Sequence, residues 1–360
     1  MKRLLAGTAA IAAAVLFLSC PVQAISARKA ILLDATTGRV IYEKAADDRS
    51  LIASTTKIMT ALIVCEQCNV LDRMSIPKEA VGIEGSSIYL KEGEVLTLQE
   101  LLYGMMLHSG NDAATALAIY CGGTVEGFAQ LMNDKARMLK MNGSHFVNPH
   151  GLDAPDHYST ARDLAILAQY AMENPIFYQT VSTKNVRIGN RNLSNHNKLL
   201  WRVEGADGVK TGYTRSAGRI LVSSAQRQGR RLVAVTIDDG NDWADHASLY
   251  ELGFREFELR QVLTKGQTVG QIAVFGGTLC QVGLLADEDF HFSLTAAEEP
   301  IIRLSLKEFV FAPVAQGQEA GYAYICIGDK TVGKVLLRYD QTIELQPAQK
   351  QHFWQRWFGE

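Results

Sequence analysis

Ser54-Thr55-Thr56-Lys57 is followed directly by an apolar run, Ile58-Met59-Thr60-Ala61-Leu62-Ile63-Val64. A run of this kind predicts a buried helix. Because helical residues three positions apart share one face, the side chains of Ser54 and Lys57 are expected to touch. The stretch therefore predicts a core helix that starts with a paired hydroxyl and amine.

Two further strings follow in order, Ser109-Gly110-Asn111 and Lys210-Thr211-Gly212. A bare S-x-x-K is expected about once by chance in a chain of this length. A second copy does occur at Ser26 and Lys29, where it runs straight into the strand-like stretch Ala30-Ile31-Leu32-Leu33. Order, spacing and the helix that follows favour the copy at Ser54 as the functional one.

Composition sets broad limits. The chain has 360 residues, of which 47% are hydrophobic, and a formal net charge of −2. Such a chain can form one large or two smaller domains with a sizeable core. The balanced charge gives no reason to expect a nucleic acid as partner.

The N-terminus resembles a targeting segment. Lys2-Arg3 precedes an apolar stretch from Leu4 to Leu18, and Val22-Gln23-Ala24 offers small-residue cleavage after Ala24. Residues 1–24 are therefore predicted to be a signal peptide, and the rest to work outside the cytoplasm, at the outer face of the membrane. An uncleaved anchor remains an alternative, and Cys20 only weakly matches a lipoprotein processing site.

Five cysteines follow the signal segment: Cys65, Cys68, Cys121, Cys280 and Cys326. An odd number argues against a complete disulfide framework. Cys65 and Cys68 have C-x-x-C spacing, but no second Cys/His pair is placed to complete a zinc site. They are expected to be thiols packed on a helix or one local disulfide.

The middle of the chain predicts a sheet assembled from both of its ends, with helices inserted between the strands. A hairpin is expected over residues 30–44. Thr97 and Glu100 form a capping-box pattern. The other expected elements are helices at 98–107, 111–122, 124–139, 164–172 and 245–259, and strands at 208–211, 219–224 and 231–237.

After Val262, short segments of alternating polarity predict a small all-β domain that ends near Leu345. Its expected strands are 291–294, 301–304, 322–325 and 334–337. The last residues combine four aromatics with basic residues: Lys350, Phe353, Trp354, Arg356, Trp357 and Phe358. As a helix they suit the headgroup boundary of a membrane, but a tail packed on its own β domain is an equal alternative.

The residue types predict acyl transfer. A serine hydroxyl becomes nucleophilic when a neighbouring base takes its proton. Lys57 can be that base only if burial or a nearby charge, such as that of Lys210, lowers its pKa. Ser109 can relay a proton to a departing amine, and the Asn111 amide can position a substrate backbone. Capping a helix is a compatible role for both.

Lys210-Thr211-Gly212 is expected on a strand, where a peptide can be added as a further strand. Gly212 would leave room for its approach. Lys210 and Thr211 can bind a terminal carboxylate, and the N–H groups of Tyr213 and Ser54 can form an oxyanion hole.

With these three strings, the chain resembles the serine-type D-alanyl-D-alanine carboxypeptidases, the low-molecular-mass penicillin-binding proteins of peptidase family S11. The likeness extends to the amino-acid sequences of the segments 107–114, 148–153 and 209–214. It covers roughly residues 26–260, and the rest more weakly.

The resemblance implies an α/β (α+β) fold, in which a β-lactamase/transpeptidase-like antiparallel sheet is flanked by helices. The implied domains are a catalytic domain at 25–260, a β-sandwich at 261–345 and an amphipathic tail at 346–360. The resemblance also implies that Ser54 removes the terminal D-alanine from peptidoglycan stem peptides, that β-lactams acylate it, and that no metal or organic cofactor is needed.

Two positions depart from some relatives. Certain members carry a carboxylate-binding Arg after the last sheet strand, where this chain has the acidic stretch Asp238-Asp239-Gly240-Asn241-Asp242-Trp243. Thr211 and Lys210 would then bind the carboxylate, helped by Arg215 or Arg219 if either faces the site. Tyr213 stands where some relatives have His.

Alternatives remain. A D,D-endopeptidase uses the same chemistry. A class A β-lactamase would need a Glu-x-x-Leu-Asn string between Asn111 and Lys210, and a Ser-His-Asp hydrolase a G-x-S-x-G string; neither string occurs. A catalytically inactive peptidoglycan-binding protein is disfavoured by the intact strings. A zinc peptidase would draw on a loop cluster: His145, His150, Asp153, Asp156 and His157.

Overall fold

The computed structural model describes residues 24–347. The segment expected to be a signal peptide, up to Gln23, and the tail from Ala348 onwards lie outside this range. Between these limits, no helix is both long and apolar enough to cross a lipid bilayer.

The first structural unit is organised around a five-stranded sheet in the order β2-β1-β9-β8-β7, and all four neighbouring pairs are antiparallel. Its strands are β1 (Lys29–Asp34), β2 (Val40–Lys44), β7 (Ala206–Thr214), β8 (Gly218–Arg227) and β9 (Arg230–Ile237). The N-terminal hairpin pairs with a strand some 200 residues later, since Ile31 lies opposite Val235. The predicted sheet built from both ends of the region is confirmed.

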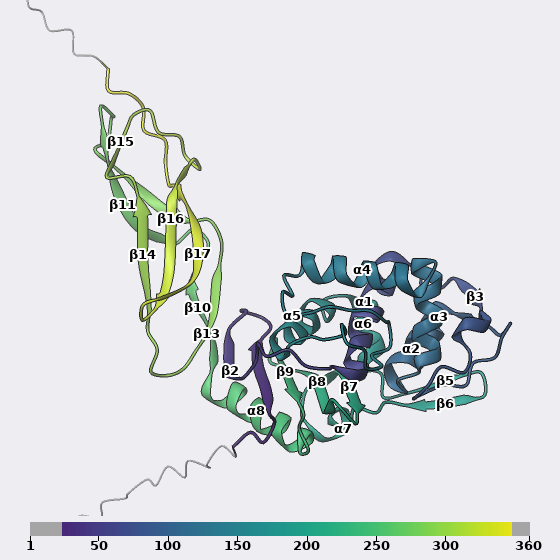
Figure 1. Cartoon of the computed structure of the whole chain (residues 1–360). Coiled ribbons are helices and arrows are strands. Elements are labelled where there is room, and N and C mark those ends of the chain that lie inside the picture. The colour runs from purple at the N-terminus through teal and green to yellow at the C-terminus, as the bar shows by residue number, and fades with distance from the viewer. Residues whose placement is uncertain (1–23, 348–360) are drawn as a thin grey trace, which may run out of the picture.

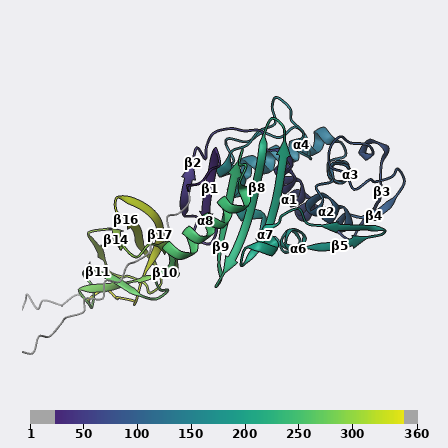
Figure 2. The ribbon, with the colours of Figure 1, turned by 90° about the horizontal axis from the view of Figure 1, so that it is seen from below.

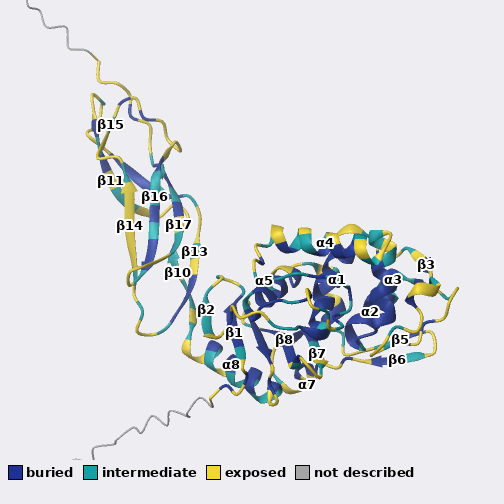
Figure 3. Ribbon diagram, viewed as in Figure 1, coloured by how far each residue is buried: buried dark blue, intermediate teal, exposed yellow. Residues whose placement is uncertain are grey.

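Both faces of this sheet are buried, because alternate strand residues point to opposite sides. Ile31 and Leu33 of β1 belong to the main core, which the larger group of helices covers. Ala30 and Leu32 face a second cluster that contains Tyr250 of α8 (Asp242–Glu256). Figure 2 shows α8 crossing the strands, and Figure 3 shows the buried residues concentrated in the sheet and in the helices that cover its other face.

The helices are α1 (Lys57–Gln67), α2 (Leu98–Leu107), α3 (Asn111–Gly122), α4 (Val125–Met138), α5 (Ala161–Ala171), α6 (Pro175–Ser182), α7 (Leu199–Arg202) and α8 (Asp242–Glu256). Helix α2 begins with the predicted capping box of Thr97 and Glu100. The last helix was expected at residues 245–259, but α8 begins and ends three residues earlier. It ends there because the chain from Glu258 pairs with a later strand at Leu294.

Short elements complete this unit around the helices. The 3₁₀ turns are η1 (Ala53–Thr56) and η2 (Lys78–Ala80). Two small hairpins are formed by β3 (Arg73–Ser75) with β4 (Val95–Thr97) and by β5 (Asn185–Ile188) with β6 (Arg191–Ser194).

The C-terminal β domain contains a six-stranded sheet in the order β14-β16-β17-β12-β11-β15, and a two-stranded sheet of β10 and β13 next to α8. Its strands are β10 (Glu258–Leu263), β11 (Thr268–Phe275), β12 (Gln281–Ala286), β13 (Phe290–Leu294), β14 (Pro300–Leu306), β15 (Phe309–Phe311), β16 (Glu319–Ile327) and β17 (Lys330–Tyr339). The mixed α+β fold with a C-terminal all-β domain is as predicted. The expected strands correspond to β13, β14, β16 and β17, whereas β10, β11, β12 and β15 were not named from the sequence.

Polar contacts join the two parts. Arg39 forms an ion pair of 2.7 Å with Glu298. The buried Asp34 carboxylate accepts a hydrogen bond of 2.6 Å from Arg230 and one of 2.5 Å from the hydroxyl of Ser293 in β13. Because Asp34 is fully buried, this network fixes the end of β1 against the first strands of the β domain.

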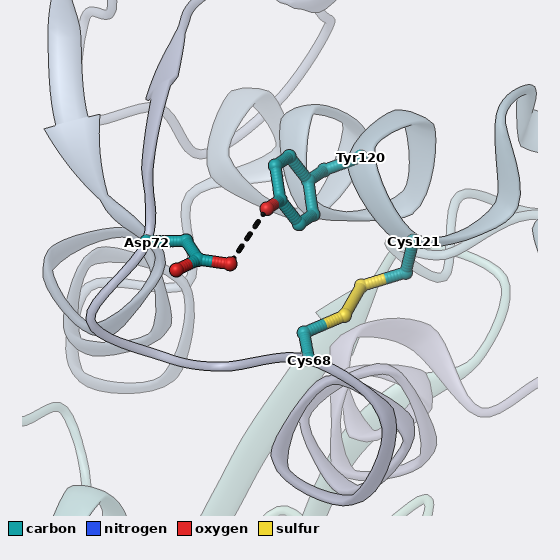
Figure 4. The surroundings of a disulfide bond; sticks show 4 residues. All are labelled: Cys68, Asp72, Tyr120 and Cys121. Carbon is teal, nitrogen blue, oxygen red and sulfur yellow. Dashed lines mark hydrogen bonds between the residues drawn. A yellow bond between two sulfur atoms is a disulfide. The ribbon is translucent and has the colours of Figure 1, made fainter.

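The cysteines pair differently from the expectation of a local disulfide. Cys68 is joined to Cys121, which links the residue just after α1 to the last turn of α3, and Tyr120 nearby donates a hydrogen bond to Asp72 (Figure 4). Cys65 is a buried free thiol on α1. The C-x-x-C spacing places its second cysteine beyond the helix end, where it faces another helix instead of Cys65.

Candidate active site

Ser54 lies in the 3₁₀ turn η1, just before α1. The loop around Gly151 packs against this turn, where a Cβ atom on Gly151 would come within 1.9 Å of the Ala53 carbonyl oxygen. Ser54 is partly exposed and lines a cavity of about 580 Å³, a size that suits a small peptide. The tight turn thus presents the hydroxyl at the cavity wall.

Lys57 is the first residue of α1 and is fully buried. Its Nζ atom lies 3.0 Å from Oγ of Ser54, so the predicted contact is confirmed. The same nitrogen lies 2.7 Å from Oδ1 of Asn111 and 2.6 Å from the carbonyl oxygen of His150. Two acceptors can take both hydrogens of a neutral amine, which leaves its lone pair for the Ser54 hydroxyl.

Burial holds the pKa of Lys57 well below its ordinary value, and the charge of Lys210 lowers it further, while Asp112 acts in the opposite direction. Burial also lowers the pKa of Lys210, to about 7. The sequence had suggested Lys210 as the nearby charge, and the structure supports that suggestion. An uncharged Lys57 is a competent base near neutral pH.

Ser109 lies in the three-residue connection between α2 and α3. It is buried, has a positive φ of 65° and lines the cavity. The connection is held in place by Asp112, which accepts hydrogen bonds from the backbone N–H groups of Ile88 and Leu90. The Ser109 side chain therefore faces the same space as Ser54.

Asn111 makes contacts that were not expected from the sequence. Its Oδ1 accepts from Lys57, and its Nδ2 donates a hydrogen bond of 2.5 Å to the carbonyl of Glu84. Only about 4% of the residue is exposed, and it is not part of the cavity wall. Asn111 thus orients the amine of Lys57, a role that sequence spacing alone does not reveal.

Strand β7 brings the third string to the cavity. Thr211 and Tyr213 line it, whereas Lys210 points inward and is 1% exposed. Gly212, which was expected to make room for a substrate, also lines the cavity. A Cβ atom there would lie 3.2 Å from both the amide nitrogen of Ser54 and the carbonyl oxygen of Ile52. The glycine therefore allows β7 to pack against η1.

One wall of the cavity comes from the acidic stretch after β9. Arg219, opposite Tyr213 on β8, forms a bidentate ion pair with Asp242 at 2.7 and 2.8 Å and lies over the ring of Trp243. All three residues line the cavity. Arg215 is exposed on the turn after β7 and does not line it.

The loop histidines serve other contacts. His157 lies 2.7 Å from the Thr56 hydroxyl, and Nδ1 of His145 lies 2.6 Å from the Asp156 carbonyl oxygen. Asp153 accepts from Thr214. Among residues 24–347 no three potential ligands converge, so the zinc-peptidase alternative finds no donor set.

Sequence inspection missed His108 and His196, which also line the cavity and whose ring centroids are 4.8 Å apart. Burial lowers the pKa of His196 to about 4. His108 adjoins Ser109, but nothing in the sequence brings His196 to it. The second S-x-x-K copy lies elsewhere: Ser26 donates to Asp245, and Lys29 donates to Ser50.

A helix-flanked antiparallel sheet, with a cavity-lining serine in hydrogen-bond contact with a buried lysine, is the arrangement expected of a serine-type acyl-transferring enzyme. Family models agree: residues 17–241 match the D-alanyl-D-alanine carboxypeptidase family, peptidase S11, and residues 257–345 match the C-terminal domain of penicillin-binding protein 5. The chain belongs to this family of serine-type D-alanyl-D-alanine carboxypeptidases.

Individual relatives are similar over most of the chain. Carboxypeptidase DacF of Bacillus subtilis is 31% identical over 82% of this chain and 80% of its own length. DacD of Escherichia coli is 33% identical over 84% and 83%. The crystal structure of penicillin-binding protein 5 from Haemophilus influenzae superimposes with a TM-score of 0.78 at 28% identity, and covers 89% of this chain and 98% of that one.

Proposed function

We propose that the protein removes the terminal D-alanine from peptidoglycan stem pentapeptides through an ester on Ser54. The observation that carries this proposal is the buried Lys57 amine, 3.0 Å from the Ser54 hydroxyl, with two acceptors for its hydrogens. Family membership supports the same substrate class.

In the proposed reaction the peptide lies along the exposed edge of β7 as a further strand. Ser54 gives its proton to Lys57 and attacks the carbonyl carbon between the two D-alanines. The N–H groups of Ser54 and Tyr213 stabilise the oxyanion. The proton passes through Ser109 to the departing D-alanine nitrogen. Water, whose proton is taken by Lys57, then attacks the ester carbonyl, and Lys57 returns the proton to the departing Oγ of Ser54. β-Lactams acylate the same oxygen.

The substrate carboxylate is proposed to bind Thr211 and Arg219, with Lys210 supplying positive charge behind them. Both Thr211 and Arg219 line the cavity, and Asp242 holds the guanidinium in one orientation. We expect Arg219→Ala to raise KM for a pentapeptide about 10-fold or more, because a charge-assisted bond is lost. For the same peptide with a C-terminal amide, KM should not change; an equal rise for both would argue against carboxylate binding.

We further propose a division into a signal peptide (1–24), a catalytic domain (25–260), a β-sandwich (261–345) and a membrane-associated tail (346–360). The enzyme would then work outside the cytoplasm. Sequencing the mature protein tests the first boundary, since it should begin at Ile25. The variant Trp354→Ser/Trp357→Ser tests the membrane-associated tail, since this variant should be released from membranes.

The function is tested with a labelled penicillin and a stem pentapeptide. We expect one adduct, on Ser54, and released D-alanine. Ser54→Ala should lose both, whereas Ser26→Ala, at the second S-x-x-K copy, should keep both. An adduct elsewhere, or none with no D-alanine released, would contradict the proposal. Cleavage of a cross-linked dimer at a higher kcat/KM than the pentapeptide would favour the endopeptidase alternative.

A further inference from the structure

An exposed apolar patch lies at the end of the C-terminal β domain. It consists of Phe275, Leu279, Phe309, Phe311 and Leu345, which are 53, 48, 42, 69 and 59% exposed. The three phenylalanine rings contact one another, with centroid distances of 5.1, 6.2 and 5.4 Å. We call these five residues the distal patch. Exposed apolar residues gathered in this way are typical of an interaction surface.

Backbone hydrogen bonds make the distal patch one connected structure. Strand β15 runs parallel to β11, so Phe311 lies beside Phe275. The Ala312 N–H donates to the Phe275 carbonyl, and Leu345 forms a bridge with Gly277 in the turn that follows β11. The patch is therefore a feature of the folded sheet edge and its adjoining turn, rather than a set of independent loops.

The distal patch lies at the end of the β domain that is opposite the catalytic part. The contacts between the two parts involve residues near the start of the domain, such as Ser293 and Glu298. Strand β15 is at the far end of the elongated sheet in Figure 1. A surface that binds the patch would thus hold the active site at a distance of one domain length.

The chain itself indicates what that surface is. The Gln346 N–H donates to the carbonyl of Gly276, next to the patch residue Phe275, and two residues later the segment 348–360 begins. That segment carries Trp354, Trp357 and two basic residues, which are types that favour the boundary between lipid headgroups and acyl chains. An aromatic patch at the point where such a segment begins meets the same boundary.

We propose that the distal patch inserts into the lipid surface of the membrane as a second contact, beside the tail. Bound through two adjacent elements, the β domain would stand in a fixed orientation rather than hang from a single anchor. Phenylalanine suits this contact because its burial adds apolar area at a small cost in side-chain entropy.

Cys280 provides a specific probe. It adjoins the patch residue Leu279 and is exposed, whereas the other free cysteines among residues 24–347 are buried. The mature full chain, labelled on Cys280 with an environment-sensitive fluorophore, is mixed with vesicles of phosphatidylethanolamine and phosphatidylglycerol. We expect a blue shift of the emission, and quenching by a quencher placed in the acyl chains.

The variant Phe275→Ser/Phe309→Ser/Phe311→Ser should lose the shift and bind vesicles about tenfold or more weakly. Ile301→Ser is the matched control: Ile301 is 50% exposed but lies at the start of β14, close to Glu298, and it should behave as the parent. D-alanine release from a soluble pentapeptide by all variants reports that the catalytic part is folded, and an unchanged far-UV circular dichroism spectrum reports that the β domain is. Phe311→Ser alone serves if the triple variant does not fold.

An unshifted probe on vesicle-bound protein would overturn the proposal, because the tail alone would then account for binding. Unchanged vesicle affinity of the triple variant would do the same. A shift that depends on protein concentration without vesicles would show that a second copy covers the patch, and would also overturn it.

Discussion

Nζ of Lys57 donates a hydrogen bond of 2.7 Å to Oδ1 of Asn111, the first residue of α3. At the other end of α3, a disulfide joins this helix to the end of α1. The base is thus oriented by an amide from a neighbouring helix. An amide oxygen accepts a hydrogen without adding charge, so it orients the amine without raising its pKa as a carboxylate would.

Replacing this amide by a carboxylate tests its neutrality. Asn111→Asp should raise the pKa of Lys57, because an opposite charge at hydrogen-bond distance stabilises the ammonium. The neutral amine is the active form, so the acid limb of kcat/KM should move to higher pH and activity at pH 7 should fall about 10-fold or more. A lower kcat/KM at every pH, with the acid limb at the same pH as in the parent, would contradict the electrostatic role of Asn111.

Lys210 should influence both limbs of the pH profile. Activity should rise as Lys57 loses its proton and fall as Lys210 loses its own, and burial places both pKa values below the ordinary lysine value. Lys210→Met removes one charge from the neighbourhood of Lys57, so the acid limb should move upward and the alkaline limb should disappear. The measurement is kcat/KM for a pentapeptide against pH; unchanged limbs would exclude Lys210 as the nearby charge.

Gly212→Ala tests the packing of β7 on η1. The added Cβ atom would stand 3.2 Å from the amide nitrogen of Ser54, so the turn must shift. A displacement of the nucleophile by a few tenths of an ångström should lower kcat/KM about 10- to 100-fold. Gly240→Ala is the control, since no atom lies within 4 Å of its added Cβ. Equal activity of the two variants would show that Gly212 has no packing role.

The disulfide between Cys68 and Cys121 closes a sequence separation of 53 residues. Cys68→Ala/Cys121→Ala should lower the free energy of unfolding by about 2–4 kcal/mol, because the unfolded chain regains loop entropy. Urea midpoints for loss of penicillin binding measure the effect, with Cys280→Ala as the control at an exposed free thiol. Identical midpoints would show that the cross-link adds no stability.

Local sequence signals predicted much of the fold and part of the candidate site. The capping-box pattern of Thr97 and Glu100 predicts the start of α2, and the spacing of Ser54 and Lys57 predicts their contact. Both predictions succeed because the residues involved lie within one helical turn of each other. Long-range relations were missed. The pairing of Cys68 with Cys121 depends on how helices pack, and so does the contact of the His150 carbonyl with Lys57.

Gly212 shows that a residue in a recognised pattern can have a second role that the sequence does not reveal. The string Lys210-Thr211-Gly212 indicates a strand edge at the site, as observed. The glycine, however, is needed by the turn behind the strand, which lies some 160 residues earlier in the chain. Only the assembled sheet brings these two segments into contact.

The central claim is that an uncharged Lys57 activates Ser54. The most direct test is the rate constant for acylation of Ser54 by a labelled penicillin, measured against pH in the parent and in Lys57→Ala. We expect the parent rate to rise through a pKa well below 10.5, and the variant to be slower by about 10² to 10⁴ with that limb absent. Acylation of Lys57→Ala at the parent rate, with the same pH dependence, would contradict the account.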